Sequence, residues 1–199
     1  MSDTKERILQ TALRLFAANG YEAVSVSAIA GELGMTKGAL YKHYKNKRDI
    51  FDSIVTRMEQ RDAERAKDFE LPDGTLAEME DEYCNASINQ MVEYSKSQFR
   101  YWTEDEFASA FRRMLTLEQY RNEEMGQLYQ QYLASGPLGY VSDLFNSLEL
   151  PQPQKKAVDF YAPMFLLYTI YDGAEDKKSV LSMVDVSLEK LRTDLNQRK

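Results

Sequence analysis

A short polar segment in the first quarter of the chain carries the side chains that proteins use to bind DNA. Hydroxyl, lysine, histidine and glycine positions fall within eight residues, at Thr36, Lys37, Gly38, Tyr41, Lys42 and His43. Lysines neutralise phosphates, polar side chains hydrogen-bond to phosphates or base edges, and glycine lets the backbone approach a partner closely. We therefore predict that this segment contacts bases or phosphates. The alternative is a polar helix face that meets only solvent.

Two short helices are expected to hold these residues in place. Ser25 can accept hydrogen bonds from the backbone N–H groups that open the first helix, and Gly34 can take the left-handed conformation at its end. Thr36 can cap the second helix, in which Leu40 and Tyr44 are expected to point inward while lysines crowd the other side. A helix, a tight turn and a basic second helix form the helix-turn-helix unit, which places its second helix in the major groove.

The sequence of this segment resembles that of a known family. Residues 34–47 read Gly-Met-Thr-Lys-Gly-Ala-Leu-Tyr-Lys-His-Tyr-Lys-Asn-Lys and closely resemble the recognition-helix signature of the tetracycline-repressor (TetR) family. The resemblance runs from about residue 8 to about residue 54. The residues that it implies at phosphates are Tyr41, Tyr44, Lys47 and Ser25. For Tyr44 a second interpretation stays open, namely a core residue that only leans outward.

The charge distribution agrees with a DNA-binding end. The net charge of −7 argues against a nucleic-acid partner for the chain as a whole. Residues 1–50, however, hold eight Lys or Arg against five Asp or Glu, whereas the remaining residues hold 17 against 27. A small basic end on a larger acidic body fits a protein that touches phosphate only through its first quarter.

Several functional classes are not supported by the composition. A single cysteine, Cys84, cannot form an intrachain disulfide, and a single histidine, His43, leaves no cluster for a metal site. There is no Gly-rich phosphate loop and no pair of residues for nucleophilic catalysis, so we expect neither an enzyme nor a cofactor. No run is long enough to span a membrane and the N-terminus lacks a hydrophobic signal segment, so we expect a cytoplasmic protein with no membrane partner.

The chain shows helical periodicity throughout and no alternating strand pattern. A first helix ending at Asn19-Gly20 is expected to pack behind the two helices of the helix-turn-helix. A long helix capped by Asn46 is expected to run from the DNA-binding unit into the acidic body, as far as Lys67. Thr103 is expected to open a later helix through a capping box with Glu106.

We predict an all-α fold with two domains. Residues 1–48 would form a three-helix helix-turn-helix domain, joined by the long helix to a helical effector-binding and dimerisation bundle over residues 49–199. The segment 160–171 is apolar nearly all round, and the last helix carries one stripe of Val180, Val184, Leu188, Leu191 and Leu195. By the resemblance, these last two helices form a homodimer interface. Pro163 departs from a regular helix and is expected to kink or restart it.

The body is rich in aromatic and methionine side chains, which predicts an adaptable cavity for a small molecule. Packing alone is the alternative for most of these positions. Acidic neighbours such as Glu78, Glu82 and Glu93 would favour a cationic, lipophilic ligand through charge and cation–π contacts, although a solvated face explains them equally well. The candidate ligand-binding residues are Tyr83, Met91, Tyr94, Trp102, Phe107, Phe111, Met114, Tyr129, Tyr132, Tyr161, Phe165 and Tyr168.

Together these features predict a ligand-responsive transcriptional regulator, in particular a repressor. It would bind palindromic double-stranded operator DNA as a homodimer and be released by a small-molecule effector in the C-terminal domain. Two alternatives remain: a DNA-binding protein with no effector, and a helical ligand-carrier or interaction protein without specific DNA binding.

Overall fold

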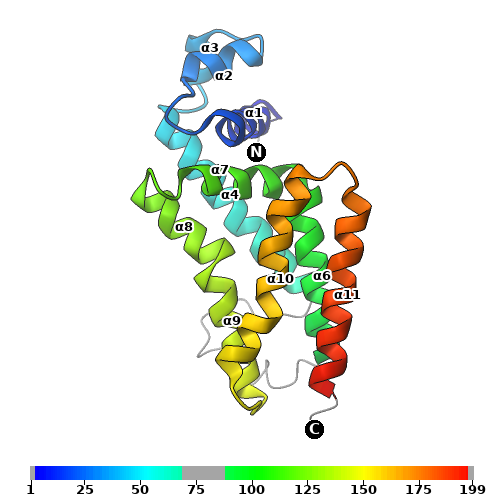
Figure 1. Cartoon of the computed structure of the whole chain (residues 1–199). Coiled ribbons are helices and arrows are strands. Elements are labelled where there is room, and N and C mark those ends of the chain that lie inside the picture. Colours follow the sequence, from blue (N-terminus) through cyan, green and yellow to red (C-terminus); the bar gives the residue numbers. More distant parts are fainter. Residues whose placement is uncertain (1–2, 69–87, 197–199) are drawn as a thin grey trace. The chain divides into compact units, whose positions relative to one another are not determined.

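The computed structural model describes residues 3–68 and 88–196, with side chains over residues 3–67 and 88–194, and its regular structure in these ranges is all helical (Figure 1). The first helices are α1 (Asp3–Asn19), α2 (Val26–Glu32), α3 (Lys37–Tyr41) and α4 (Lys47–Asp68). The later helices are α6 (Ile88–Glu104), α7 (Glu106–Glu118), α8 (Glu123–Leu133), α9 (Ser135–Ser147), α10 (Pro153–Gly173) and α11 (Lys177–Asn196). The all-α prediction is confirmed.

Local sequence signals set the helix ends in the N-terminal part. α1 stops at Gly20, which has a φ of +84° and so takes a conformation that other residues rarely adopt. Asn46 Oδ1 accepts a hydrogen bond from the Asp49 amide at 2.8 Å, and the Asp49 carboxylate accepts one from the Lys45 amide at 2.8 Å. The predicted cap at the start of α4 is therefore confirmed.

The capping box expected at Thr103 is wrong. Thr103 lies inside α6, and its hydroxyl donates to the carbonyl of Phe99, 2.7 Å away and one turn earlier. Because Thr103 is still part of α6 and its hydroxyl is directed back along that helix, it does not stand at the N-cap position of the next helix. The following helix, α7, begins at Glu106 without this cap. α10, by contrast, runs through Pro163 from Pro153 to Gly173.

The chain divides into two compact units. Unit 1 comprises Met1–Glu64 and Glu106–Tyr129, and unit 2 comprises Arg65–Asp105 and Gln130–Lys199. Unit 1 thus holds α7 and most of α8 together with the helix-turn-helix, because α7 packs along α1. The domain boundary at residue 48, which follows from the extent of the helix-turn-helix in the sequence, remains a prediction.

Unit 1 is built around α1. One face of α1 is fully buried, and α4 contributes four more side chains with no exposed surface, Ile50, Phe51, Ile54 and Met58. α7 lies alongside α1 in Figure 1 and buries Phe111 and Met114 completely. The two reading helices are therefore attached to an apolar core.

Unit 2 is a bundle in which α10 contacts α6, α9 and α11. Phe99 of α6 stacks on Tyr168 of α10 with ring centroids 4.8 Å apart and planes inclined by 6°. Lys96 of α6 pairs with Glu189 of α11 at 2.6 Å. α6 and α11 run side by side (Figure 1).

Candidate nucleic-acid interface

Each helix of the helix-turn-helix begins at a residue whose side chain caps it. Ser25 Oγ accepts a hydrogen bond from the Ala28 amide at 3.1 Å, and Thr36 Oγ1 accepts one from the Ala39 amide at 3.1 Å. Gly34, with a φ of +66°, makes the turn between the two helices. The sequence therefore folds locally into a helix-turn-helix because each helix begins at a side-chain oxygen and the turn contains a residue that tolerates positive φ.

The polar side of α3 faces solvent. Lys37, Gly38, Tyr41 and Lys42 are all exposed, and at 100° per residue they fall on one side of the helix. Lys37 Nζ lies 5.7 Å from the centroid of the Tyr41 ring, so a cation and an aromatic hydroxyl are presented together. A Cβ atom added at Gly38 would meet nothing within 4 Å. The space over this glycine is open to a partner.

The remaining predicted DNA contacts differ in exposure. Ser25 and Thr36 are exposed although their oxygens serve as caps, and His43 is half-buried beside Lys42. The predicted contacts described so far all lie in α2, in α3 or in the residues that flank these helices. Contact of each of these residues with DNA stays a prediction.

Tyr44 packs against α1 instead of standing free. Its side chain is 4% exposed, and its hydroxyl donates to the Lys5 carbonyl at 3.3 Å. Burial, with smaller contributions from Asp49 and Glu6, raises the pKa of Tyr44 to about 12. The ring of Tyr44 is therefore part of the core, as the second interpretation held. A phosphate contact could be made only by the hydroxyl edge, and it remains a prediction.

Lys47 has partners within the protein that sequence reasoning missed. Its Nζ donates to the Tyr21 carbonyl at 2.9 Å and to the Glu22 carbonyl at 3.4 Å, and it lies 4.2 Å from the centroid of the Tyr21 ring. The Glu22 carboxylate is 3.5 Å away. Lys47 therefore fastens the start of α4 to the link between α1 and α2. Its predicted phosphate contact would have to be made alongside these bonds.

Two acidic residues of the α7–α8 corner also reach the DNA-binding part of unit 1. Glu118, 2% exposed, accepts a hydrogen bond from the Tyr21 amide at 2.9 Å. Glu124 accepts two hydrogen bonds from the guanidinium of Arg48, at 2.5 and 2.6 Å. No sequence signal could have found these pairs, since the partners are 97 and 76 residues apart.

Comparison with known proteins agrees with this geometry. The family profile described as "Bacterial regulatory proteins, tetR family" matches residues 8–54, the span that contains most of α1, all of α2 and α3, and the start of α4. Residues 8–54 of this chain are therefore similar to the DNA-binding segment of the TetR family. The match covers the helix-turn-helix whose caps and exposed face are described above.

Two curated relatives that match parts of this chain are named as regulators. An uncharacterized HTH-type transcriptional regulator of Bacillus subtilis, YerO, is 49% identical over 47 residues, covering 24% of this chain and 16% of that protein. The HTH-type transcriptional regulator AcrR of Shigella flexneri is 36% identical over 81 residues, covering 41% of this chain and 31% of that protein. The chain thus matches less than a third of the length of either relative.

Solved structures of other proteins share the fold over nearly the whole chain. The fatty acid degradation regulator FadR from Bacillus halodurans has a TM-score of 0.65 at 16% identity and covers 96% of each chain. A complex of SmeT with triclosan has a TM-score of 0.65 at 16% identity, over 96% of this chain and 90% of that one. At these identities the likeness shows the fold alone. The two curated relatives are named as transcriptional regulators, which agrees with the prediction that this chain is not an enzyme.

The predicted ligand-binding residues are divided between the two units. Tyr83 lies outside the described residues. Unit 1 contains Phe107, Phe111, Met114 and Tyr129, and unit 2 contains Met91, Tyr94, Trp102, Tyr132, Tyr161, Phe165 and Tyr168. Phe111 and Met114 have no exposed surface and pack in the unit that carries the reading helices. The structure therefore does not gather the whole set into one unit, and each residue's role stays a prediction.

An apolar groove in unit 2 contains two of the predicted ligand residues. It lies between the end of α8, α9 and α10, has a volume of about 360 Å³, and is lined in part by Leu138, Tyr161 and Phe165. The Tyr161 hydroxyl donates to the Leu133 carbonyl at 2.9 Å, so its polar end is satisfied within the protein. The groove offers mainly hydrocarbon and aromatic surface.

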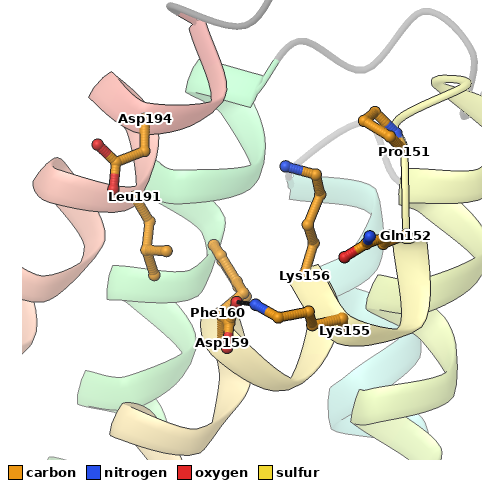
Figure 2. Close-up of a pocket in the computed structure, with 8 residues that line it drawn as sticks. All are labelled: Pro151, Gln152, Lys155, Lys156, Asp159, Phe160, Leu191 and Asp194. Atoms are coloured by element: carbon orange, nitrogen blue, oxygen red, sulfur yellow. Dashed lines mark hydrogen bonds and ion pairs between the residues drawn. The ribbon is translucent and has the colours of Figure 1, made fainter.

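A second hollow in unit 2 is more polar and was not predicted. Figure 2 shows it where the first turns of α10 meet the last turns of α11, with Lys155, Lys156 and Asp194 at its rim and Phe160 and Leu191 at its base. Its volume is about 250 Å³. Lys155 is already paired with Asp159 of its own helix.

The described residues contain no group of three or more His, Cys, Asp or Glu side chains that could hold a metal ion. Within the same ranges, every helix is too short or too polar to cross a membrane.

Proposed function

We propose that this chain is a ligand-responsive transcriptional regulator that binds operator DNA as a homodimer, and that it acts as a repressor. The observation that carries the proposal is the exposed face of α3, with Lys37, Tyr41 and Lys42 around an open Gly38, in a helix-turn-helix of the TetR family. Lysines and hydroxyls on a helix that enters the major groove can reach both phosphates and base edges.

The homodimer is proposed from uncovered apolar side chains on α10 and α11. Leu166 is 60% exposed and Val186 66%, and Phe165, Ile170 and Met183 are also exposed. Large apolar side chains grouped on two helices are typical of a surface that another subunit covers. The stripe of α11 that suggested the interface in the sequence faces inward instead, since Val180, Val184 and Leu188 are at most 3% exposed. The interface we propose therefore uses the opposite side of α11.

An effector in unit 2 is proposed from its aromatic interior and its apolar groove. Tyr161 and Phe165 in that groove would suit a lipophilic molecule. The SmeT structure was solved with triclosan, and FadR is named for fatty acid degradation, so two fold relatives are named with apolar compounds. An effector that lowers operator occupancy a hundredfold must favour the released state by about 2.7 kcal/mol.

Selection of binding sites from random double-stranded DNA tests the DNA-binding part of the proposal. We expect enrichment of a near-palindrome whose half-sites are about one helical turn apart, since each subunit of a dimer presents one reading helix. Absence of any sequence preference would refute it and would favour a helical carrier or interaction protein.

Linkage tests the effector part. Lipophilic compounds, triclosan among them, are screened by thermal shift, and the best binder is titrated against the free protein and against the operator complex. Operator must weaken ligand binding by the factor by which ligand weakens operator binding. Equal ligand affinities in the two titrations would remove ligand control from the proposal.

A further inference from the structure

In the link between α1 and α2, Tyr21 contacts three helices of unit 1. Its ring makes edge contacts with Phe16 of α1 at 5.0 Å and Phe51 of α4 at 5.5 Å, measured between centroids. Its carbonyl accepts from Lys47, and its amide donates to Glu118 of α7. Three helices therefore meet at the residue from which the chain departs toward the helix-turn-helix.

The Glu118 contact is the directional part of this junction. Many of the side chains that α1 and α7 bury are apolar, among them Phe16, Phe111 and Met114, and apolar contacts have no preferred direction. A hydrogen bond to one backbone amide specifies both a distance and an angle. A carboxylate that is only 2% exposed also loses much of its hydration, so displacing it from the Tyr21 amide would leave both groups without that partner.

Gly20 shows how closely Glu118 approaches. A Cβ atom at position 20 would lie 2.7 Å from Glu118 Oε1. The glycine is needed for its φ of +84° and also for the room that it leaves to the carboxylate. The Arg48–Glu124 pair is a second tie from the same corner, but both side chains are about half exposed, so solvent weakens it.

Because of these contacts, the helix-turn-helix belongs to the same unit as every segment of chain that leads into unit 2. Along the chain, unit 1 joins unit 2 after Glu64, before Glu106 and after Tyr129. With α7 fixed to the α1–α2 link, all three connections enter one body that includes the reading helices. Without that attachment the helix-turn-helix would depend on α4 alone, which is the single connection that the sequence suggested.

We propose that Glu118 is a positioning residue for DNA recognition: through the Tyr21 amide it fixes the orientation of the helix-turn-helix on α7, and thereby the half-site spacing that the dimer accepts. The inference rests on the proposed function. It adds a residue far from α3 in the sequence that governs operator geometry without touching DNA.

The test compares Glu118→Ala, Glu118→Gln and the exposed control Glu123→Ala on the selected operator and on copies with one or two base pairs added or removed between half-sites. We expect Glu118→Ala to lose about tenfold in affinity for the native spacing and to discriminate less among spacings. Glu118→Gln retains an acceptor oxygen and should keep most of the preference. Glu123→Ala should behave as wild type.

Thermal unfolding and helicity of each variant separate positioning from loss of fold. A folded Glu118→Ala protein with the wild-type spacing profile would overturn the inference while leaving the proposed function in place. If Glu118→Ala does not fold, amide exchange in the wild-type protein decides: Tyr21 must exchange much more slowly than its exposed neighbour Glu22, and equal rates would overturn the inference. Failure to select any operator would remove the proposed function, and this inference with it.

Discussion

Replacing Gly38 by alanine should affect folding and DNA binding in opposite directions. Gly38 lies in α3, and a Cβ atom there would meet no atom of the protein within 4 Å. Alanine is favoured over glycine in helices by about 0.8–1.0 kcal/mol, and less is expected in a helix of five residues. The variant should therefore be as stable as the wild type or more stable by up to about 1 kcal/mol.

The stability gain corresponds to a small rise in the unfolding temperature, roughly 2–4 °C per kcal/mol for a chain of this size. At the DNA, the added methyl group occupies the space through which the backbone of α3 would approach the groove. Loss of one close contact of this kind costs about 1–3 kcal/mol, so operator affinity should fall about tenfold or more.

Gly31→Ala is the matched control for this prediction. Gly31 is an exposed glycine in the neighbouring helix α2, and its Cβ position is equally open. It should give a similar stability gain with little loss of affinity. Calorimetry and fluorescence anisotropy with labelled operator measure the two effects. If Gly38→Ala bound operator as tightly as Gly31→Ala, the exposed side of α3 would not be the surface that approaches DNA.

Three further outcomes are expected. Lys47→Ala should lower the free energy of unfolding by about 1–2 kcal/mol, because the side chain loses its contacts with the carbonyl and ring of Tyr21. It should also reduce the slope of operator affinity against salt concentration by about one. An unchanged slope would mean that Lys47 has only a structural role. Tyr44→Phe should become more stable relative to wild type as pH rises from 10.0 toward 12, because the raised pKa of Tyr44 in the folded protein makes its ionisation oppose folding. Denaturation curves give the free energies of unfolding of the two proteins. The same difference between them at pH 9 and at pH 11 would contradict this. Leu166→Glu should lower the mass measured by sedimentation from twice 23.0 kDa toward 23.0 kDa, because it puts a charge into the proposed interface. Lys178→Glu, the control, should leave the mass unchanged. If the mass of Leu166→Glu also stayed unchanged, the interface would lie elsewhere.

The features that could be predicted from the sequence are those decided by neighbours along the chain. Ser25, Thr36 and Asn46 cap helices through amides three residues away, and Gly20 and Gly34 take positive φ where a helix must end. Such signals act within one turn, so their reading needs no knowledge of the fold.

The features that could not be predicted depend on partners far away in the chain. Lys47 reads as a free surface lysine until the carbonyl of Tyr21, 26 residues earlier, is placed beside it. The stripe on α11 predicts a buried face correctly, but periodicity does not say whether the cover is the same subunit or another. Here Val180, Val184 and Leu188 turn inward, and Met183 and Val186 remain outside.

The grouping of α7 with the reading helices has a consequence for protein engineering. A chimeric regulator assembled by joining residues 1–48 to a foreign effector module would leave behind Glu118, Glu124 and the apolar side of α7 on which α1 rests. The transplanted segment would expose part of its own core and would leave the Tyr21 amide and the Arg48 guanidinium without those carboxylates. A transferable DNA-binding module should instead include residues 106–129 along with the N-terminal segment. Alternatively, it should be joined to an effector module whose corresponding helix supplies a carboxylate at the same place.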